Sequence, residues 1–288
     1  MTQNNNISVL PWYNSIYEQN HRKSYSFGDV YPLFTPKDKI LPFQIMRKTR
    51  SEIIIEAKLF TIDGVLFSDI LSDLNDSGLQ IVSFPLFGYD VIVYTGDFPM
   101  SINMTSGQYY VKISDGVEDW YSDVFTVVMD VRNYTKIEWK DIENLVFDQG
   151  QIVYKNPSFT NRLYFKEEIG KPEYTFDEVA QERDGFLFPE KQISEKTYKL
   201  TVLAPEYLCD VMRMIRLSDI IKVTDKYGRV YKCDSFLITP KWETQGNLAS
   251  VEIEFQTDTV VKKIGRGVYL SEKGDFNGDF NDDFNNII

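Results

Sequence analysis

The chain has 288 residues, of which 43% are hydrophobic and 15% aromatic, so it holds enough apolar material for two folded domains or one large one. The formal net charge of −12 argues against a surface that tracks nucleic-acid phosphates and against docking on an anionic membrane. Eighteen Tyr and twenty Phe, with many Val, Ile and Thr, favour β-structure because these residues suit a pleated, half-buried surface.

Residues 1–45 are rich in aromatic side chains but follow neither the strand period nor the helix period. Prolines recur through this segment and favour an extended arm. Disordered tails are usually polar. An arm with this many aromatic side chains is therefore expected to pack against another surface, either its own domain or a neighbouring subunit. The candidate partner-binding residues are its aromatic side chains Trp12, Tyr13, Tyr17, Phe27 and Tyr31.

Residues 46–131 have the pattern of a small β-sandwich. Strands are predicted over 52–60, 79–84 and 89–95, where apolar and β-branched residues are bounded by turn residues. A hairpin is predicted from 107–114 and 120–128, joined by a turn at Asp115-Gly116. Short strands separated by turns predict an immunoglobulin-like β-sandwich.

Residues 132–265 form a second predicted module, a β-barrel or sandwich that carries one packed helix. The helix is expected at 205–217, where Leu208, Val211, Met212 and Ile215 form an apolar stripe. The strands are expected at 151–154, 161–166, 196–203, 220–224, 229–233 and 248–257.

Residues 266–288 form a low-complexity tail with three Asp-Phe-Asn repeats. Their evenly spaced side chains Phe276, Phe280 and Phe284 are further candidates for partner binding, and the alternative is a tail without a partner. The repeat does not match an EF-hand calcium loop, because Phe280 and Asn286 stand where that loop needs Gly and Glu.

The sequence offers no constellation for catalysis or for a metal or cofactor. A Ser or Cys nucleophile usually needs a nearby base, and the single histidine, His21, lies in the N-terminal arm. Cys209 and Cys233 have neither metal-ligand nor redox spacing, which favours reduced structural thiols. We therefore expect a protein that is not an enzyme and has no catalytic, metal-binding or cofactor-binding residues.

Three stretches of the chain resemble virion tail and neck proteins of phages and prophages of gut Bacteroidales, including the crAss-like group. They are residues 10–20 (LPWYNSIYEQN), 24–43 (SYSFGDVYPLFTPKDKILPF) and 248–265 (LASVEIEFQTDTVVKKIG), and the Asp-Phe-Asn tail is similar to ends found in such proteins. The module at 132–265 also resembles distal-tail and tail-tube proteins at the level of the fold.

The resemblance implies a structural subunit of a virion, synthesised and assembled in the host cytoplasm. Residues 196–257 would form the wall of a homo-oligomeric ring, on the order of 6 or 12 copies, with the first module facing outward. The implied partners are other copies of the chain and neighbouring tail or neck proteins, with no sequence-specific nucleic acid and no membrane.

Two other classes of function remain open. In a carbohydrate-binding adhesin or receptor-binding accessory protein, Trp120, Trp139 and Trp242 would stack on sugars. An enzyme such as a phage depolymerase would need a carboxylate pair, and no pair among the 43 acidic residues stands out.

Overall fold

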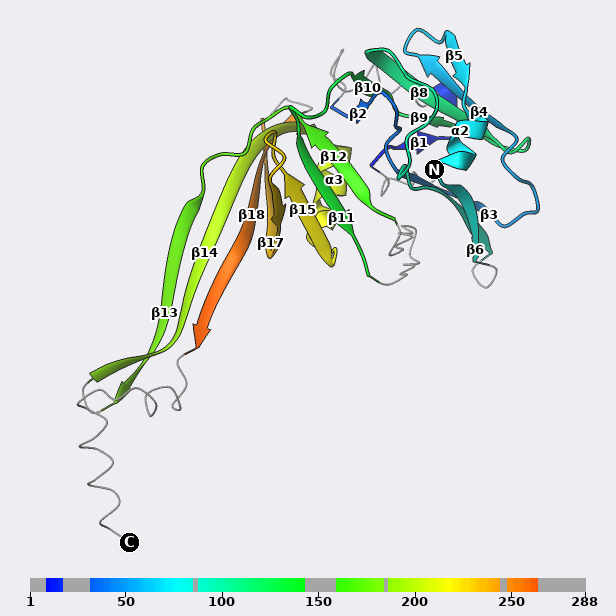
Figure 1. The fold of residues 1–288 in the computed structure, drawn as a ribbon. Helices are drawn as coiled ribbons and strands as arrows, with labels where there is room; N and C mark the ends of the chain where they lie inside the picture. Colours follow the sequence, from blue (N-terminus) through cyan, green and yellow to red (C-terminus); the bar gives the residue numbers. More distant parts are fainter. Residues whose placement is uncertain are drawn as a thin grey trace.

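The computed structural model describes residues 9–17, 32–84, 88–142, 159–183, 186–243 and 248–263. Strands dominate, and they form two β domains with a long projection leaving the second one (Figure 1). The expected mainly-β fold is confirmed, with a sandwich followed by a β domain that carries a packed helix. The predicted strand at 151–154 and residue His21 lie outside the described residues.

The first domain contains a seven-stranded sheet and a three-stranded sheet. The larger sheet has the order β1 (Trp12–Tyr13), β9 (Asp119–Ser122), β8 (Gly107–Ser114), β10 (Phe125–Val128) and β2 (Phe34–Pro36), and β4 (Glu56–Thr61) and β5 (Leu66–Asp69) extend it from β8. The smaller sheet has the order β3 (Phe43–Lys48), β7 (Tyr89–Tyr94) and β6 (Leu79–Phe84). Between β5 and β6 lies a short helix, α2 (Leu71–Asp76), which the sequence did not predict.

Aromatic packing joins the two sheets of the first domain. The rings of Trp12 on β1 and Phe43 on β3 lie 4.6 Å apart, and Phe43 stacks on Tyr94 of β7 at 5.2 Å. β7 is buried along its whole length, because its second face packs Val91 and Val93 against Phe159, a residue of the second domain. The three-stranded sheet is therefore covered on both faces.

The described parts of the segment 1–45 belong to the first domain, which agrees with the alternative that this segment packs on its own domain. β1 pairs with β9, and β2 pairs in parallel with β10. Leu10 and Leu33 beside them have no exposed surface. Strands of two or three residues between prolines are too short to show a period in the sequence, which is why pattern reasoning missed them.

A buried group of charged side chains also holds the two sheets together. The Arg47 guanidinium at the end of β3 lies 2.6 Å from the Asp115 carboxylate in the β8–β9 turn, and Arg50 lies 2.5 Å from the same carboxylate. Arg47 also contacts Asp90 of β7 at 3.5 Å. Burial by itself would raise the pKa of Asp115, but hydrogen bonds from the turn backbone and from both arginines outweigh it and lower that pKa.

The second domain has two four-stranded sheets and one longer helix. One sheet has the order β12 (Asn161–Phe165), β11 (Thr135–Lys140), β15 (Ile220–Thr224) and β16 (Val230–Lys232), and the other β13 (Glu173–Arg183), β14 (Phe186–Pro205), β18 (Leu248–Lys263) and β17 (Ser235–Trp242). The predicted helix is confirmed as α3 (Glu206–Ile215), and its stripe of Leu208, Val211, Met212 and Ile215 is buried.

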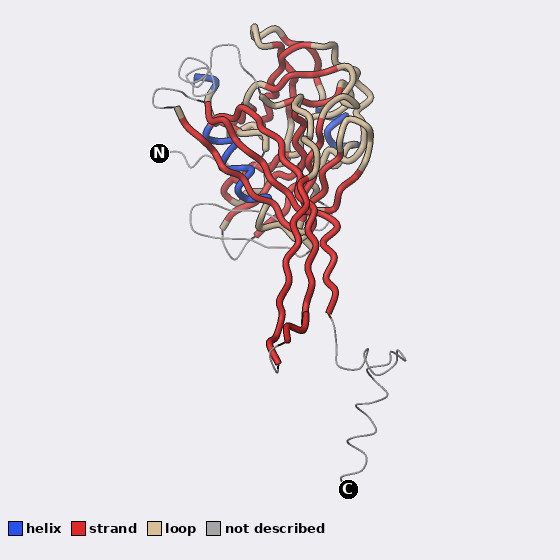
Figure 2. The backbone as a smooth tube through the Cα atoms, turned by 90° about the vertical axis from the view of Figure 1, so that its left-hand side faces the viewer, coloured by secondary structure: helices blue, strands red, loops and turns tan. Residues whose placement is uncertain are grey.

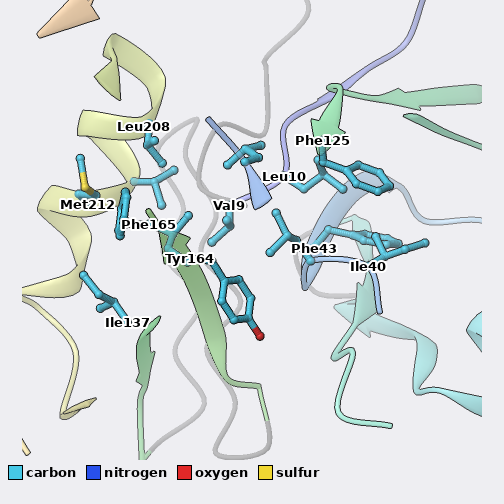
Figure 3. Packing of buried hydrophobic residues seen from close by; sticks show 14 of the residues in the cluster. Val9, Leu10, Ile40, Phe43, Phe125, Ile137, Tyr164, Phe165, Leu208 and Met212 are labelled. Atoms are coloured by element: carbon cyan, nitrogen blue, oxygen red, sulfur yellow. The ribbon is translucent and has the colours of Figure 1, made fainter. Parts of the chain in front are cut away.

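The two domains share one apolar core. Val9, Leu10 and Phe43 of the first domain lie on one side of the contact, and Phe165 and Leu208 of the second lie on the other (Figure 3). Polar contacts reinforce it, since the buried Arg162 on β12 donates to the Gly96 carbonyl at 3.0 Å and pairs with Asp97 at 3.0 Å. The orientation of the second domain is thus set by the first.

The buried carboxylate predicts a pH-dependent stability. We expect Asp115→Asn to lower the free energy of unfolding by about 3 kcal/mol at pH 7, because it leaves the buried Arg47 charge without its nearer carboxylate and with only the longer contact to Asp90. The folded-state pKa of Asp115 is depressed, so the wild-type advantage is present above the unfolded-state pKa of about 3.9 and is lost as the pH falls through the folded-state pKa.

Urea unfolding of both proteins at several pH values measures this difference. Asp76→Asn, a change at an exposed carboxylate, is the control and should cost little at any pH. An Asp115→Asn protein as stable as the wild type at pH 7 would contradict the assignment.

Candidate interaction surface on the projecting arm

Three strands leave the body of the second domain and continue together as a projection (Figures 1 and 2). We call this projection the arm from here on, and it is a different segment from the N-terminal residues 1–45. It comprises residues 173–183 of β13, 186–197 of β14 and 257–263 of β18. β14 has 20 residues and β18 has 16, so both run through the body and the arm without interruption. The arm is therefore a continuation of a body sheet.

Where the arm begins, the pairing of β18 with β17 ends and the pairing of β14 with β13 starts. In the body, β17 flanks β18 as far as Ser235, which pairs with Gln256. Gln256 pairs with Thr197 of β14, and Thr197 pairs with Glu173, the first residue of β13. One row of residues thus ends β17 and starts β13, which keeps the sheet three strands wide as far as the pair Lys191–Lys263, beyond which β13 and β14 continue as two strands.

The change in burial follows the sequence pattern of β14. In the body, Tyr198, Leu200 and Val202 alternate with polar or exposed residues and are buried. Nearer the tip, Ser194 and Gln192 occupy the same face, so no apolar stripe is present to bury. A strand with this pattern is solvated on both faces, as a projecting ribbon requires.

A β-bulge lies at the base of the arm. The pairing of β14 with β18 shifts between Ser194 and Lys196, and β18 has one more residue across this step. Asp258, in this step, has a φ of 56°, a left-handed conformation that few residue types other than glycine adopt easily. The Asp234 carboxylate accepts a hydrogen bond from the next amide, that of Thr259, at 3.0 Å.

The arm exposes apolar side chains on both faces. Phe176 and Val260 lie in one cross-strand row with Ser194 between them, and they are 66% and 61% exposed. On the opposite face, Val261 shares a row with Ile193 and is also exposed. Exposed aromatic and branched residues on a narrow sheet are typical of a surface that another chain covers.

Both edges of the arm are open. Within the described part of the chain, no strand pairs with the outer side of β13 or with β18 beyond Gln256. An open edge presents amide and carbonyl groups that can pair with another strand. The charges of the two edges differ, because β13 carries Glu173, Asp177, Glu178 and Glu182, whereas the distal part of β18 carries Val260, Val261 and Lys262 beside Asp258.

The partner-binding residues predicted from the sequence do not gather on this arm. Trp12 and Tyr13 are 3% and 7% exposed and belong to the core of the first domain, so these two side chains pack on their own domain, one of the two alternatives that the sequence left open. Tyr17 is 81% exposed. Phe27, Tyr31, Phe276, Phe280 and Phe284 lie outside the described residues.

The tryptophan residues proposed for sugar stacking are not brought together on a surface. Trp120 and Trp139 are buried in different domains, and Trp242 at the end of β17 is half exposed. Stacking on a sugar requires an exposed ring face, so the structure gives this set no support.

The two cysteines lie within the second domain, Cys209 buried and Cys233 partly buried. Burial raises the pKa of the Cys209 thiol to about 11 and that of Cys233 to about 12, and both cysteines are free thiols. In the portion of the chain that is described, no three His, Cys, Asp or Glu residues are grouped as metal ligands. The described helices include none long and apolar enough to cross a membrane.

Comparison with known proteins found no family model, no curated protein and no solved structure that matches this chain.

The bulge makes a specific prediction about the arm. We expect Asp258→Val to lower the free energy of unfolding by about 1–2 kcal/mol, because a β-branched residue is strained in the left-handed conformation. Asp258→Asn is the control, since asparagine tolerates this conformation and removes only the charge. Urea unfolding and hydrogen exchange of the amides at 259–263 measure the effect, and equal stability of the two variants would show that this conformation is not required.

Proposed function

We propose that the chain is a non-catalytic structural subunit of a phage virion, a tail or neck protein that assembles into a ring through its arm. The observation that carries the proposal is the projecting arm, whose two edges pair with no other strand within the described part of the chain. It agrees with the resemblance of residues 10–20, 24–43 and 248–265 to virion proteins.

Main-chain pairing is the contact that the open edges support best. A strand of a neighbouring copy can add to either edge and satisfy its free amide and carbonyl groups, as in β-augmentation. The same contact covers the exposed side chains of Phe176 and Val260, because both lie on strands that form the edges. Pairing thus removes apolar surface from water at the same time.

The edge charges favour a head-to-tail arrangement. Two copies of the β13 edge would place the carboxylates of Asp177, Glu178 and Glu182 close together, and like charges across a strand pair are destabilising. Pairing β13 of one copy with the distal part of β18 of the next avoids this repulsion and lets Lys262 face the acidic edge. Contacts of this head-to-tail type generate closed rings when the rotation between copies closes.

The shared core of the two domains supports a defined ring geometry. Because β12 is packed against the first domain and both domains share one apolar core, the arm leaves the body in one direction (Figures 1 and 3). A fixed angle between the two contact edges is what a closed ring needs, whereas a free hinge would permit open aggregates.

The test measures the mass of the full-length protein by light scattering at rising concentration, with negative-stain images. We expect a discrete large oligomer for the wild type. Val260→Glu/Lys262→Glu makes the β18 edge acidic, and Glu178→Lys/Glu182→Lys makes the β13 edge basic; each pair should shift the protein to monomers, because each creates like-charged edges.

Mixing the two variants gives the decisive result. Each variant then offers an edge that complements the other, so we expect oligomers to return on mixing. Val230→Glu/Lys232→Glu on β16 makes the same chemical changes at exposed positions outside the arm and should leave assembly unchanged. A wild type that stays monomeric at every concentration, or edge variants that assemble normally, would contradict the proposal.

A further inference from the structure

A cavity of about 550 Å³ lies where the arm leaves the body of the second domain. It is enclosed by the start of β13 and the adjoining part of β14, by the turn between β15 and β16, and by the segment that precedes β13. Four tyrosines line it: Tyr174, Tyr198, Tyr227 and Tyr231. Four cationic side chains line it as well: Lys171, Lys196, Lys226 and Arg229.

The turn between β15 and β16, beside the cavity, is held in shape by hydrogen bonds to one buried carboxylate. Asp225, which is 6% exposed, accepts hydrogen bonds from the Tyr227 and Arg229 amides at 2.9 Å each. Its second oxygen accepts from the Arg229 Nε at 2.7 Å and from the Tyr231 hydroxyl at 3.2 Å. Burial would raise the pKa of Asp225, but these hydrogen bonds outweigh it and lower the pKa, so this carboxylate is ionised and its oxygens are engaged by the turn.

Two of the tyrosines are packed against each other and two are exposed, and the exposed Tyr227 ring also contacts the Lys226 ammonium at 5.2 Å and the Arg229 guanidinium at 5.4 Å. Tyr198 and Tyr231 are buried with ring centroids 4.8 Å apart, and the Lys196 ammonium lies 5.3 Å from the Tyr198 ring. Tyr174 and Tyr227 are 71% and 73% exposed at the mouth of the cavity. Aromatic rings are stabilised by edge-to-face or offset contacts with a further ring, so this arrangement fits an aromatic side chain.

The charge of the residues that line the cavity indicates the charge of the ligand that it would bind. Of the four cations, Lys226 pairs with Glu168 and Arg229 pairs with Asp225, which leaves Lys171 and Lys196 in excess over the carboxylates of the lining, in a protein whose formal net charge is −12. The excess of positive charge favours an acidic ligand. A ligand that places a carboxylate next to an aromatic ring would use both the tyrosines and the lysines.

The chain itself contains a segment with this chemistry. Residues 275–286 read DFNGDFNDDFNN, in which an aspartate stands directly before each of Phe276, Phe280 and Phe284. The segment holds four aspartates and no basic residue. It is thus the chemical complement of the cavity.

The segment is also within reach. Thr257 pairs with Lys196, which lines the cavity, and β18 continues from there to Lys263. These six residues carry the chain roughly 20 Å along the arm, at about 3.3 Å per residue. Residues 264–275 can span up to about 40 Å when extended, which suffices to return to the cavity.

We propose that the cavity at the base of the arm binds the Asp-Phe-Asn segment 275–286 of the same chain, one repeat at a time. The Phe ring of a repeat enters between the tyrosines, and the preceding aspartate pairs with the cationic rim. This contact is independent of the ring proposed above, because every residue that forms it belongs to one copy.

The test uses the full-length chain with Phe276→Ser, Phe280→Ser and Phe284→Ser, which leaves the cavity without its own ligand. The probe is a fluorescein-labelled peptide of residues 272–288, followed by fluorescence anisotropy. We expect saturable binding that weakens as salt is added, because part of the attraction is ionic. The same peptide with serine in place of its three phenylalanines should not bind.

Substitutions in the cavity locate the site. In the same background, Tyr227→Ser or Lys196→Glu should weaken binding by about tenfold or more, as expected for a central aromatic or charged contact. Phe98→Ser and Lys241→Glu alter exposed residues of the same types elsewhere and should leave binding unchanged. Circular dichroism of each variant checks that the fold is retained.

The wild-type chain provides the second readout. Its own segment competes at a high effective concentration, so the peptide should bind at least about tenfold more weakly than to the serine variant. Absence of saturable binding, insensitivity to both cavity substitutions, or equal affinity of the wild type would each overturn the proposal. Light scattering on the same samples reports ring assembly separately, so failure of one proposal is distinguishable from failure of the other.

Discussion

The pairing of β14 with β18 is the constraint on which the second domain and its arm depend. Its body half contains buried rows such as Tyr198–Phe255 and Leu200–Ile253, and its arm half contains exposed rows. A solvated ribbon of a few strands is only marginally stable by itself, because it buries little apolar surface. Because the same strands run from the body into the arm, the buried rows in the body hold the exposed rows of the arm in register. The apolar rows of the body therefore stabilise a projection that has no core of its own.

The contact between the domains extends this constraint to the whole chain. β12 packs on the first domain, and Phe159 covers the outer face of the three-stranded sheet of that domain. The domain that bears the arm is therefore held in place by apolar burial and by the bonds of Arg162 to the loop at Gly96 and Asp97. This arrangement suits a subunit whose two contact edges must keep a constant angle, and it places the aromatic cavity next to the root of the arm.

Pattern reasoning located much of the fold and little of the candidate site. The strands at 79–84, 107–114 and 220–224 match β6, β8 and β15, and the helix was found within two residues at either end, because their apolar periods are regular. β13 was missed because its exposed face and edge give it no apolar alternation, and the predicted strand 120–128 is divided into β9 and β10 where the Asp123 amide bonds to the Pro11 carbonyl. The distal part of the arm lies among residues with a weak pattern, whereas the cavity combines residues of predicted strands, such as Tyr198 and Tyr231, with Tyr174 of the strand that was missed.

The sequence by itself determined the mainly-β class, the amphipathic helix and the acidic Asp-Phe-Asn segment, since each follows from local composition or a local period. Only the tertiary structure decided that Trp12 and Tyr13 are core residues, that β14 and β18 outrun β17, and that residues as distant as Tyr174 and Tyr231 line one cavity. These features depend on which strands become neighbours and in what register. The choice of neighbouring strands and their register are both set by pairing between residues far apart in the sequence, which a local sequence pattern does not reveal.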